Sequence, residues 1–196
     1  MGLAAKKQDV KFTYADYLSR DDKESWEIIN GEAYNMSPAP PTIHQLISGE
    51  LYLQIGNQLK GKPCRVIPAP FDVRLPLGYE HQEDIENIVQ PDISVVCDKT
   101  KLDDKGCLGA PDLIIEIISP SSSRKDRMEK FFLYERMGVK EYWLVSPEDK
   151  IVEVFILEPD GKYSRPGIYS ESDIVPLNIL NDIKVDLSSV FNITID

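Results

Sequence analysis

Two acidic side chains stand where apolar side chains are expected. Glu116 lies in the middle of the aliphatic run 112–118, whose β-branched composition is typical of a strand inside a sheet. Asp92 begins a second such run, 92–97, which we expect to form a neighbouring strand. A buried ionised carboxylate is costly unless it is paired, protonated or bound to a metal. Glu116 and Asp92 are therefore the first candidates for a chemical role.

A lysine on an apolar helix face is the third candidate. The serines that follow Ser119 and Pro120 predict a helix start, and we expect the helix to run to Met137 with Gly138 as its C-terminal stop. At about 100° per residue, the face of Lys130 also carries Ser123, Asp126, Arg127, Leu133, Tyr134 and Met137. Lysines are almost never fully buried unless they are paired. We therefore expect Lys130 to bind a carboxylate of the sheet.

Two carboxylates and a lysine around a divalent cation would suit phosphodiester hydrolysis. Oxygen ligands hold Mg²⁺, which neutralises a phosphate oxygen and lowers the pKa of its bound water, and an ammonium group offsets charge in the transition state. In this hypothesis Asp92, Glu116 and the backbone carbonyl of Ile117 hold Mg²⁺ or Mn²⁺. Lys130 takes the polar role. Asp112 shares the strand face of Glu116 but lies about 13 Å away at about 3.3 Å per residue, so we do not expect it to bind the same ion.

Each of the three candidates also has a purely structural interpretation. Asp92 could be a turn carboxylate after Pro91, and Lys130 could extend its ammonium group to water while its stem packs. Glu116 could form a buried ion pair with one of three arginines, Arg65, Arg74 or Arg127.

The remaining pattern predicts alternating strands and helices. We expect a short helix over 13–19, a hairpin of 26–30 and 33–36 with an Asn-Gly turn, and an amphipathic helix from 42 to about 60. Strands are expected at 65–67, 70–75, 141–145, 151–157 and 163–169, and the tail suggests a strand and a helical turn over 187–191. The polar segment 76–90 reads as an exposed or mobile loop.

Charge and composition limit the possible functions. The chain of 196 residues has 42% hydrophobic residues and a formal charge of −11, which excludes a disordered polymer and a surface that is basic throughout. Residues 124–140 nevertheless hold six basic and three acidic side chains. From this segment Arg124, Lys125 and Arg127 are candidates for contact with nucleic acid, although ordinary solvated charges explain the same count.

The three cysteines and the N-terminal segment indicate where in the cell the protein is expected. Cys64, Cys97 and Cys107 show no CxxC spacing, and the N-terminus lacks a basic segment followed by an apolar one. The longest apolar run is far shorter than the roughly 20 residues that span a bilayer. We therefore expect a cytoplasmic protein with reduced thiols and no membrane partner.

The same residues also resemble a known family. Pro91-Asp92 followed by Glu116 is similar to the PD-(D/E)xK motif of restriction-endonuclease-like nucleases. Over about residues 12–190 the chain resembles the bacterial Uma-two family, described as "putative restriction endonucleases", in an ordered set of segments: Ile29-Asn-Gly-Glu32, Met36-Ser-Pro38, His44, Gln90-Pro-Asp-Ile93, 111–120, Asp126-Arg-Met-Glu-Lys130 and 138–145. The resemblance implies DNA as the substrate, whereas the residues alone indicate only a metal-assisted phosphodiesterase.

One position departs from the superfamily motif. Ile118 stands where the motif has its lysine, and the resemblance implies that the lysine has moved to the next helix, where Lys130 matches. The resemblance also keeps Glu32 and His44 as auxiliary candidates, although a solvated turn acid and a local hydrogen-bonding histidine are the alternatives. Asp72 could enter the site from a neighbouring strand or could be exposed.

The sequence thus predicts an α/β fold of restriction-endonuclease-like type, with a central mixed β-sheet flanked by α-helices. We expect one domain over 1–196 with a core of about 12–190. A homodimer is expected because many strands would otherwise leave free sheet edges. The predicted function is metal-dependent DNA cleavage; the alternatives are a catalytically inactive nucleic-acid or protein binding module on the same fold, and a hydrolase of small phosphodiesters.

Overall fold

The computed structural model describes residues 11–19, 26–36, 39–78 and 80–193. Its helices are the α-helices α1 (Tyr14–Ser19), α2 (Thr42–Gln58), α3 (Phe131–Met137) and α4 (Leu187–Phe191), the 3-10 helices η1 (Gln82–Asp84) and η2 (Lys99–Lys101), and the π-helix η3 (Lys125–Lys130). Its strands are β1 (Trp26–Ile29), β2 (Glu32–Asn35), β3 (Arg65–Pro68), β4 (Val73–Arg74), β5 (Ile88–Val89), β6 (Ile93–Val96), β7 (Leu102–Asp103), β8 (Gly106–Leu108), β9 (Leu113–Ile117), β10 (Glu141–Ser146), β11 (Ile151–Ile156), β12 (Gly167–Ser170), β13 (Ile174–Pro176) and β14 (Lys184–Asp186).

Two six-stranded mixed sheets form the framework. The main sheet has the strand order β12-β11-β10-β9-β6-β3, in which only β9 and β10 run parallel. A second sheet has the order β2-β1-β5-β4-β8-β7, and β13 pairs with β14. The expected α/β class is confirmed. The strands occupy two sheets where one central sheet was expected, because the short strands β4, β5, β7 and β8 join the β1–β2 hairpin through the pairing of β5 with β1.

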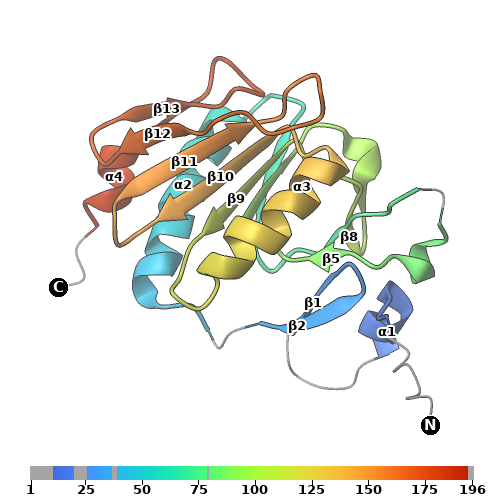
Figure 1. Cartoon of the computed structure of the whole chain (residues 1–196). Coiled ribbons are helices and arrows are strands. Elements are labelled where there is room, and N and C mark those ends of the chain that lie inside the picture. Colours follow the sequence, from blue (N-terminus) through green and yellow to red (C-terminus); the bar gives the residue numbers. More distant parts are fainter. Residues whose placement is uncertain (1–10, 20–25, 37–38, 79, 194–196) are drawn as a thin grey trace, which may run out of the picture.

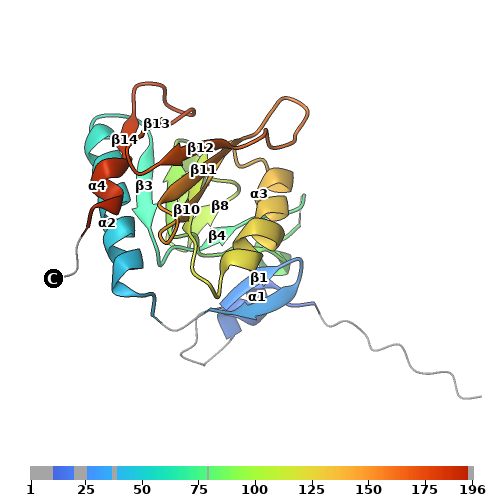
Figure 2. The same ribbon diagram turned by 60° about the vertical axis from the view of Figure 1, so that its left-hand side comes forward.

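The main sheet carries different partners on its two faces. Figures 1 and 2 show α2 and α4 on one face and α3 on the other. Ile93, Ile115 and Trp143 belong to the apolar core on the α2 face, together with Leu51 of α2. Residues one position along the strands, such as Ile114 and Leu144, face Leu133 of α3 and residues of the second sheet. Glu116 lies on this second face because side chains alternate along a strand.

Local signals for turns and helix ends are confirmed. Asn30 and Gly31 both have positive φ, 56° and 80°, and form the tight turn between β1 and β2. Gly138 ends α3 in the left-handed region with a φ of 82°. The helix that was expected to begin near Ser119 includes a π-helical turn, η3, directly before α3.

The segment 76–90 differs from the exposed loop that its polarity predicts. Ile85, Ile88 and Val89 are buried, and β5 lies between β1 and β4 in the second sheet. Buried Asn87 accepts a hydrogen bond from the backbone N–H of Asn30 and donates one to the carbonyl of Leu75. Asn87 therefore links the segment to the hairpin, and the apolar residues of the segment pack in the core.

The cysteines differ from the expectation of reduced thiols. Cys64 and Cys97 form a disulfide that links the segments next to β3 and β6, whereas Cys107 is free and buried. The expectation fails because the antiparallel pairing of Arg65 with Val96 brings the two flanking cysteines face to face, which spacing along the chain does not reveal. Disulfides are rare in cytosolic proteins, so this pair gives no support to a cytoplasmic location.

Among the described residues, no helix combines the length and the apolar character that crossing a bilayer requires.

Candidate active site

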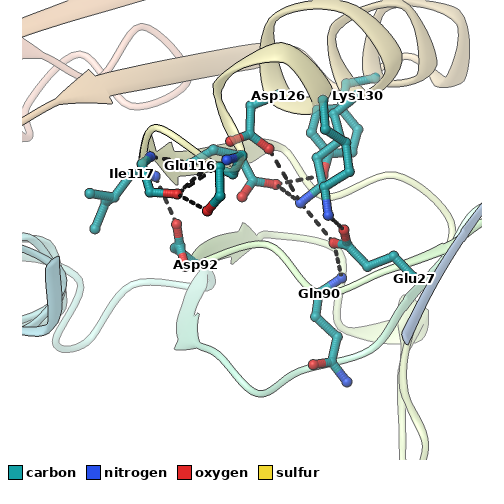
Figure 3. A network of polar contacts seen from close by, with 12 residues as sticks. Glu27, Gln90, Asp92, Glu116, Ile117, Asp126 and Lys130 are labelled. Atoms are coloured by element: carbon teal, nitrogen blue, oxygen red, sulfur yellow. Dashed lines mark hydrogen bonds and ion pairs between the residues drawn. The ribbon is translucent and has the colours of Figure 1, made fainter. Parts of the chain in front are cut away.

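A cavity of about 720 Å³ is lined by residues of α2, β9 and η3 and by Asp92, which precedes β6. Its lining includes Asp92, Glu116, Ile117 and Lys130, the four residues that the sequence assigned to one site. It also includes His44. Figure 3 shows Glu116 and Lys130 turned toward each other below the helical turn that carries Lys130, with Asp92 beside the backbone of Ile117. The spatial convergence on which the hydrolytic hypothesis depends is therefore present.

The Lys130 ammonium group is surrounded by carboxylates. Its Nζ lies 2.7 Å from Glu27 Oε1, 2.8 Å from Glu116 Oε1 and 3.8 Å from Asp126 Oδ1. Only 4% of the side chain is exposed, so Lys130 does not extend to water. Burial alone would lower the pKa of Lys130, but these three carboxylates raise it well above its ordinary value. Lys130 therefore stays charged.

Glu116 is held by two donors on one oxygen. Lys130 Nζ and the hydroxyl of Tyr134 both donate to Oε1 at 2.8 Å. Burial raises the pKa of Glu116, and although Lys130 opposes this, the negative charges of Asp126, Asp92 and Glu27 add to the rise. The site thus has more carboxyl groups than lysines, and a bound cation would favour the ionised form of Glu116.

The arginines considered as partners of Glu116 bind elsewhere, and that alternative is wrong. Arg74 pairs with Asp103 at 2.6 Å and Arg127 with Glu153 at 2.5 Å. Arg65 donates to the backbone carbonyls of Lys62 and Cys64.

Glu27 is a site residue that the sequence argument missed. It lies on β1, is completely buried, and binds Lys130 together with Lys125, whose Nζ is 2.5 Å from Glu27 Oε2. Oε1 also accepts the backbone N–H of Gln90. Burial would raise the pKa of Glu27, but the two lysines lower it, so Glu27 remains ionised. The signal was a charged residue inside the apolar strand Trp26–Ile29, the same anomaly that identified Glu116.

Asp126 is a second additional acid in the cavity. It lies on η3, is 2% exposed, and its Oδ1 has no hydrogen-bond partner. Burial raises the pKa of Asp126, with Lys130 opposing. The helical arithmetic places Asp126 on the face of Lys130, so this residue could have been found. The π-helical geometry of η3 could not have been predicted from the sequence. Single π turns are frequent at functional sites.

Asp92 also lines the cavity, and two groups contact one oxygen of its carboxylate. Its Oδ2 accepts the backbone N–H of Ile117 at 2.7 Å and lies 3.3 Å from Nε2 of His44. Burial alone would lower the pKa of His44, but the hydrogen bond and charge of Asp92 raise it. His44, near the start of α2, is therefore an immediate neighbour of the Asp92 carboxylate. Both of these contacts use Oδ2, which leaves Oδ1 of Asp92 for another ligand.

The two other auxiliary acids are not brought to the cavity. Glu32 is exposed and accepts a hydrogen bond from the Tyr34 hydroxyl. Asp72 accepts hydrogen bonds from the Tyr17 hydroxyl and from Gln90 Nε2. Neither residue lines the cavity.

The candidate nucleic-acid contacts have different surroundings. Arg124 is almost fully exposed, with 89% of its side chain accessible and Glu129 3.9 Å away. Lys125 lines the cavity but is bound to Glu27, and Arg127 is bound to Glu153. Only Arg124 of the three is therefore free to meet a phosphate without first leaving a close ion pair.

The donor set suits a hard cation that completes its coordination with water. Mg²⁺ and Mn²⁺ prefer oxygen ligands of the kind found here: Asp92 Oδ1, the second oxygen of Glu116, and Oδ1 of Asp126, which accepts no hydrogen bond. Within the described ranges, however, no three Asp, Glu, His or Cys side chains surround a common point as a metal ion needs. Two carboxylates with a backbone carbonyl and water satisfy Mg²⁺, which usually keeps several waters.

Comparison with known proteins places the chain in context. A protein of Synechocystis sp. with the name "Uncharacterized protein slr1290" is 26% identical over 156 residues, 78% of each chain. A crystal structure from Anabaena variabilis, described as "a putative nuclease belonging to DUF820", superposes with a TM-score of 0.73 at 20% identity and covers 92% of this chain and 97% of that one. At this identity the likeness shows a shared fold.

A family model also matches most of the chain. The model of Uma2, described as "Putative restriction endonuclease", matches residues 13–188. These residues hold Glu27, Asp92, Glu116, Asp126 and Lys130, and the family that the sequence segments resemble is confirmed. The chain belongs to the Uma2 family.

Proposed function

We propose that the protein is a metal-dependent nuclease that hydrolyses DNA phosphodiester bonds in the cavity between α2 and η3. The observation that carries the proposal is the convergence of Asp92, Glu116 and Lys130 on one cavity, with more carboxylates than ammonium groups. The family description and the fold shared with a protein described as a nuclease support DNA as the substrate.

In this proposal Asp92, Glu116 and the backbone carbonyl of Ile117 hold Mg²⁺ or Mn²⁺. The bound ion would neutralise a phosphate oxygen and lower the pKa of a water molecule. Tyr134 and Lys130 hold Oε1 of Glu116, so its other oxygen is available. His44 and the Ile117 N–H fix the Asp92 carboxylate by Oδ2, so Oδ1 is available in the same way.

Lys130 supplies positive charge that does not depend on pH near neutrality. Its raised pKa keeps the ammonium group protonated, and Glu27 and Asp126 hold that group at the floor of the cavity. An ammonium group in this position offsets the charge that develops on the phosphate oxygens during hydrolysis. Because the site is buried, this electrostatic contribution is larger than it would be in water.

Cleavage assays on purified protein test the proposal. We expect wild-type protein to cut plasmid and oligonucleotide DNA with Mg²⁺ or Mn²⁺, and Asp92→Ala, Glu116→Ala and Lys130→Ala to lose at least about 100-fold of that activity. Equal activity in all four preparations would reveal a contaminating nuclease and contradict the proposal.

Calorimetry separates the enzyme from a binding module on the same fold. The enzyme predicts Mn²⁺ binding that disappears in Asp92→Ala. Partner binding that needs no metal would instead favour the inactive module, and cleavage of only small phosphodiesters would identify the third alternative.

The homodimer also belongs to this proposal. The outer strands β3 and β12 of the main sheet and β2 and β7 of the second sheet each pair on one side only among the described strands. Free sheet edges favour association with another copy. Sedimentation equilibrium would show a dimer mass, and a monomer at all concentrations would contradict it.

A further inference from the structure

The reactive groups lie below the protein surface. The exposed fractions of the side chains are 5% for Glu116, 4% for Lys130 and 2% for Asp126, and 20% for Asp92. A phosphodiester bond must therefore enter the cavity to meet them. A phosphate that stays on a broad outer surface cannot reach Lys130.

Among the residues that the structure describes, the exposed part of the cavity lining is uncharged. It consists mainly of proline and alanine, with Pro40, Pro41, Pro70 and Pro120 contributing rings and Gln45 and Ser121 contributing polar groups. The charged residues of the lining are buried or only partly exposed. Phosphates next to the reacting one would consequently meet apolar rings and neutral donors.

The three basic side chains considered above offer little unpaired positive charge for a duplex. Lys125 and Arg127 are held in ion pairs of 2.5 Å, and the exposed Arg124 lies 3.9 Å from Glu129. Duplex DNA is bound chiefly through Lys and Arg contacts to several phosphates, and the duplex is stiff over about 150 base pairs. A stiff, highly charged rod fits neither the recess nor its neutral rim. A flexible single strand can bend its backbone into the recess and place unstacked bases on apolar side chains.

We infer that the site acts on single-stranded DNA, or on an unpaired stretch of a duplex, and binds it with few ion pairs. This inference rests on the proposed nuclease function and specifies its substrate.

Matched oligonucleotides test the inference. A labelled single strand, the same sequence as a blunt duplex, and the duplex with a central gap are incubated with full-length protein and Mn²⁺. We expect the single strand to be cut at least about tenfold faster than the blunt duplex, the ratio that one base contact provides, and the gapped substrate to be cut within its gap. Faster cleavage of the blunt duplex would overturn the inference while leaving the nuclease proposal intact.

Binding measured without cleavage makes the result independent of activity. In fluorescence anisotropy with Ca²⁺, we expect the logarithm of the single-strand affinity to fall with the logarithm of salt concentration with a slope no steeper than about −1.5, the value for two neutralised phosphates. A steep slope, equal affinity for the duplex, or no binding to the single strand would overturn the inference. If no DNA is cut but single-strand binding follows this pattern, the nuclease proposal fails and the binding specificity stands.

Three variants locate the strand. Ala39→Glu puts a negative charge on an exposed residue of the lining, and we expect at least about tenfold weaker single-strand binding through repulsion. Its control, Ser172→Glu, adds the same charge at an exposed residue outside the lining and should change binding less than about twofold. Arg124→Ala should have a similarly small effect. A large loss in Arg124→Ala with none in Ala39→Glu would place the nucleic acid on the helix surface and overturn the inference.

Discussion

Two acidic side chains near the two ends of β9 have different surroundings. Asp112, just before the strand, accepts the backbone N–H of Cys97 with Oδ2 and binds the exposed Lys140 with Oδ1, so both oxygens have donors. Glu116, near the other end and on the same face, shares its one ammonium partner with Glu27 and Asp126. Asp112 is a satisfied structural acid. Glu116 belongs to a group of carboxyl groups that outnumber the lysines beside them.

The difference shows that neighbours, more than residue type or burial, decide what a carboxylate can do. Both acids are buried: 5% of the whole residue is exposed for Asp112 and 3% for Glu116. A carboxylate with a donor on each oxygen has little to offer a cation, whereas a carboxylate with one oxygen free of donors and other carboxylates beside it gains from one. Substitutions at one end of the strand should therefore have consequences that the same substitutions at the other end do not.

The largest effect is expected from Lys130→Met. The variant leaves Glu27, Glu116 and Asp126 without their shared ammonium group, and we expect a loss of about 3–5 kcal/mol in the free energy of unfolding at neutral pH. Buried carboxylates without a partner have a higher pKa in the folded than in the unfolded protein. The folded state then binds protons more strongly, so the variant should regain stability as the pH falls through these raised pKa values. Urea denaturation over a pH series measures this, and a deficit that does not shrink in acid would contradict it.

The second prediction compares the two ends of β9 directly. Glu116→Gln removes charge from the cavity and should lower metal-dependent cleavage at least about 100-fold. Asp112→Asn keeps the shape of a side chain that lies outside the cavity and should change cleavage less than about threefold. Cleavage rates at saturating Mn²⁺ give both numbers. Comparable losses in the two variants would show that the strand as a whole, and not its cavity end, supports activity.

His44 tests whether Asp92 depends on its neighbour for orientation. His44→Ala removes the contact with Asp92 Oδ2 and should weaken Mn²⁺ binding about 10- to 100-fold, as residues that orient a ligand do. His44→Gln retains an N–H donor and should recover most of the affinity. Calorimetry measures both variants. Unchanged Mn²⁺ affinity in His44→Ala would mean that the Ile117 N–H positions Asp92 by itself.

The smallest effect is expected at Glu135, a carboxylate whose pKa shifts the other way. Burial would raise the pKa of Glu135, but Lys162 and the backbone N–H of Tyr163 lower it overall. Its contribution to stability is present above the unfolded pKa and disappears as the pH falls through the folded pKa. Glu135→Gln should cost about 1 kcal/mol at neutral pH, and this difference should vanish in acid. A difference that persists in acid would show that shape, not charge, matters here.

Much of the site was available from the sequence because it involves local periodicity. Strand alternation exposed Glu116 as an anomaly, and helix periodicity placed Lys130 on the inner face of its helix. The same two rules would have found Glu27, inside the strand Trp26–Ile29, and Asp126, on the face of Lys130. They were missed because neither residue belongs to the nuclease motif.

The pairing of strands that are distant in the sequence could not be predicted from local periodicity. Strands β4, β5, β7 and β8 have two or three residues each, too few for a pattern of alternation to stand out. The segment 76–90 is polar on average, yet Ile85, Ile88 and Val89 are buried because the hairpin and β4 lie on either side of β5. The Cys64–Cys97 bond likewise depends on the register of β3 with β6.

The widened turn at Lys125–Lys130 means that the segment between β9 and α3 can lose one residue and still present the same face to the cavity. Removal of the exposed Met128 would let the turn relax into regular helix, and Asp126 and Lys130 would then be three residues apart instead of four. Residues three apart still lie on the same side of a helix. A homologue with one residue fewer in this stretch should therefore keep both side chains in the cavity.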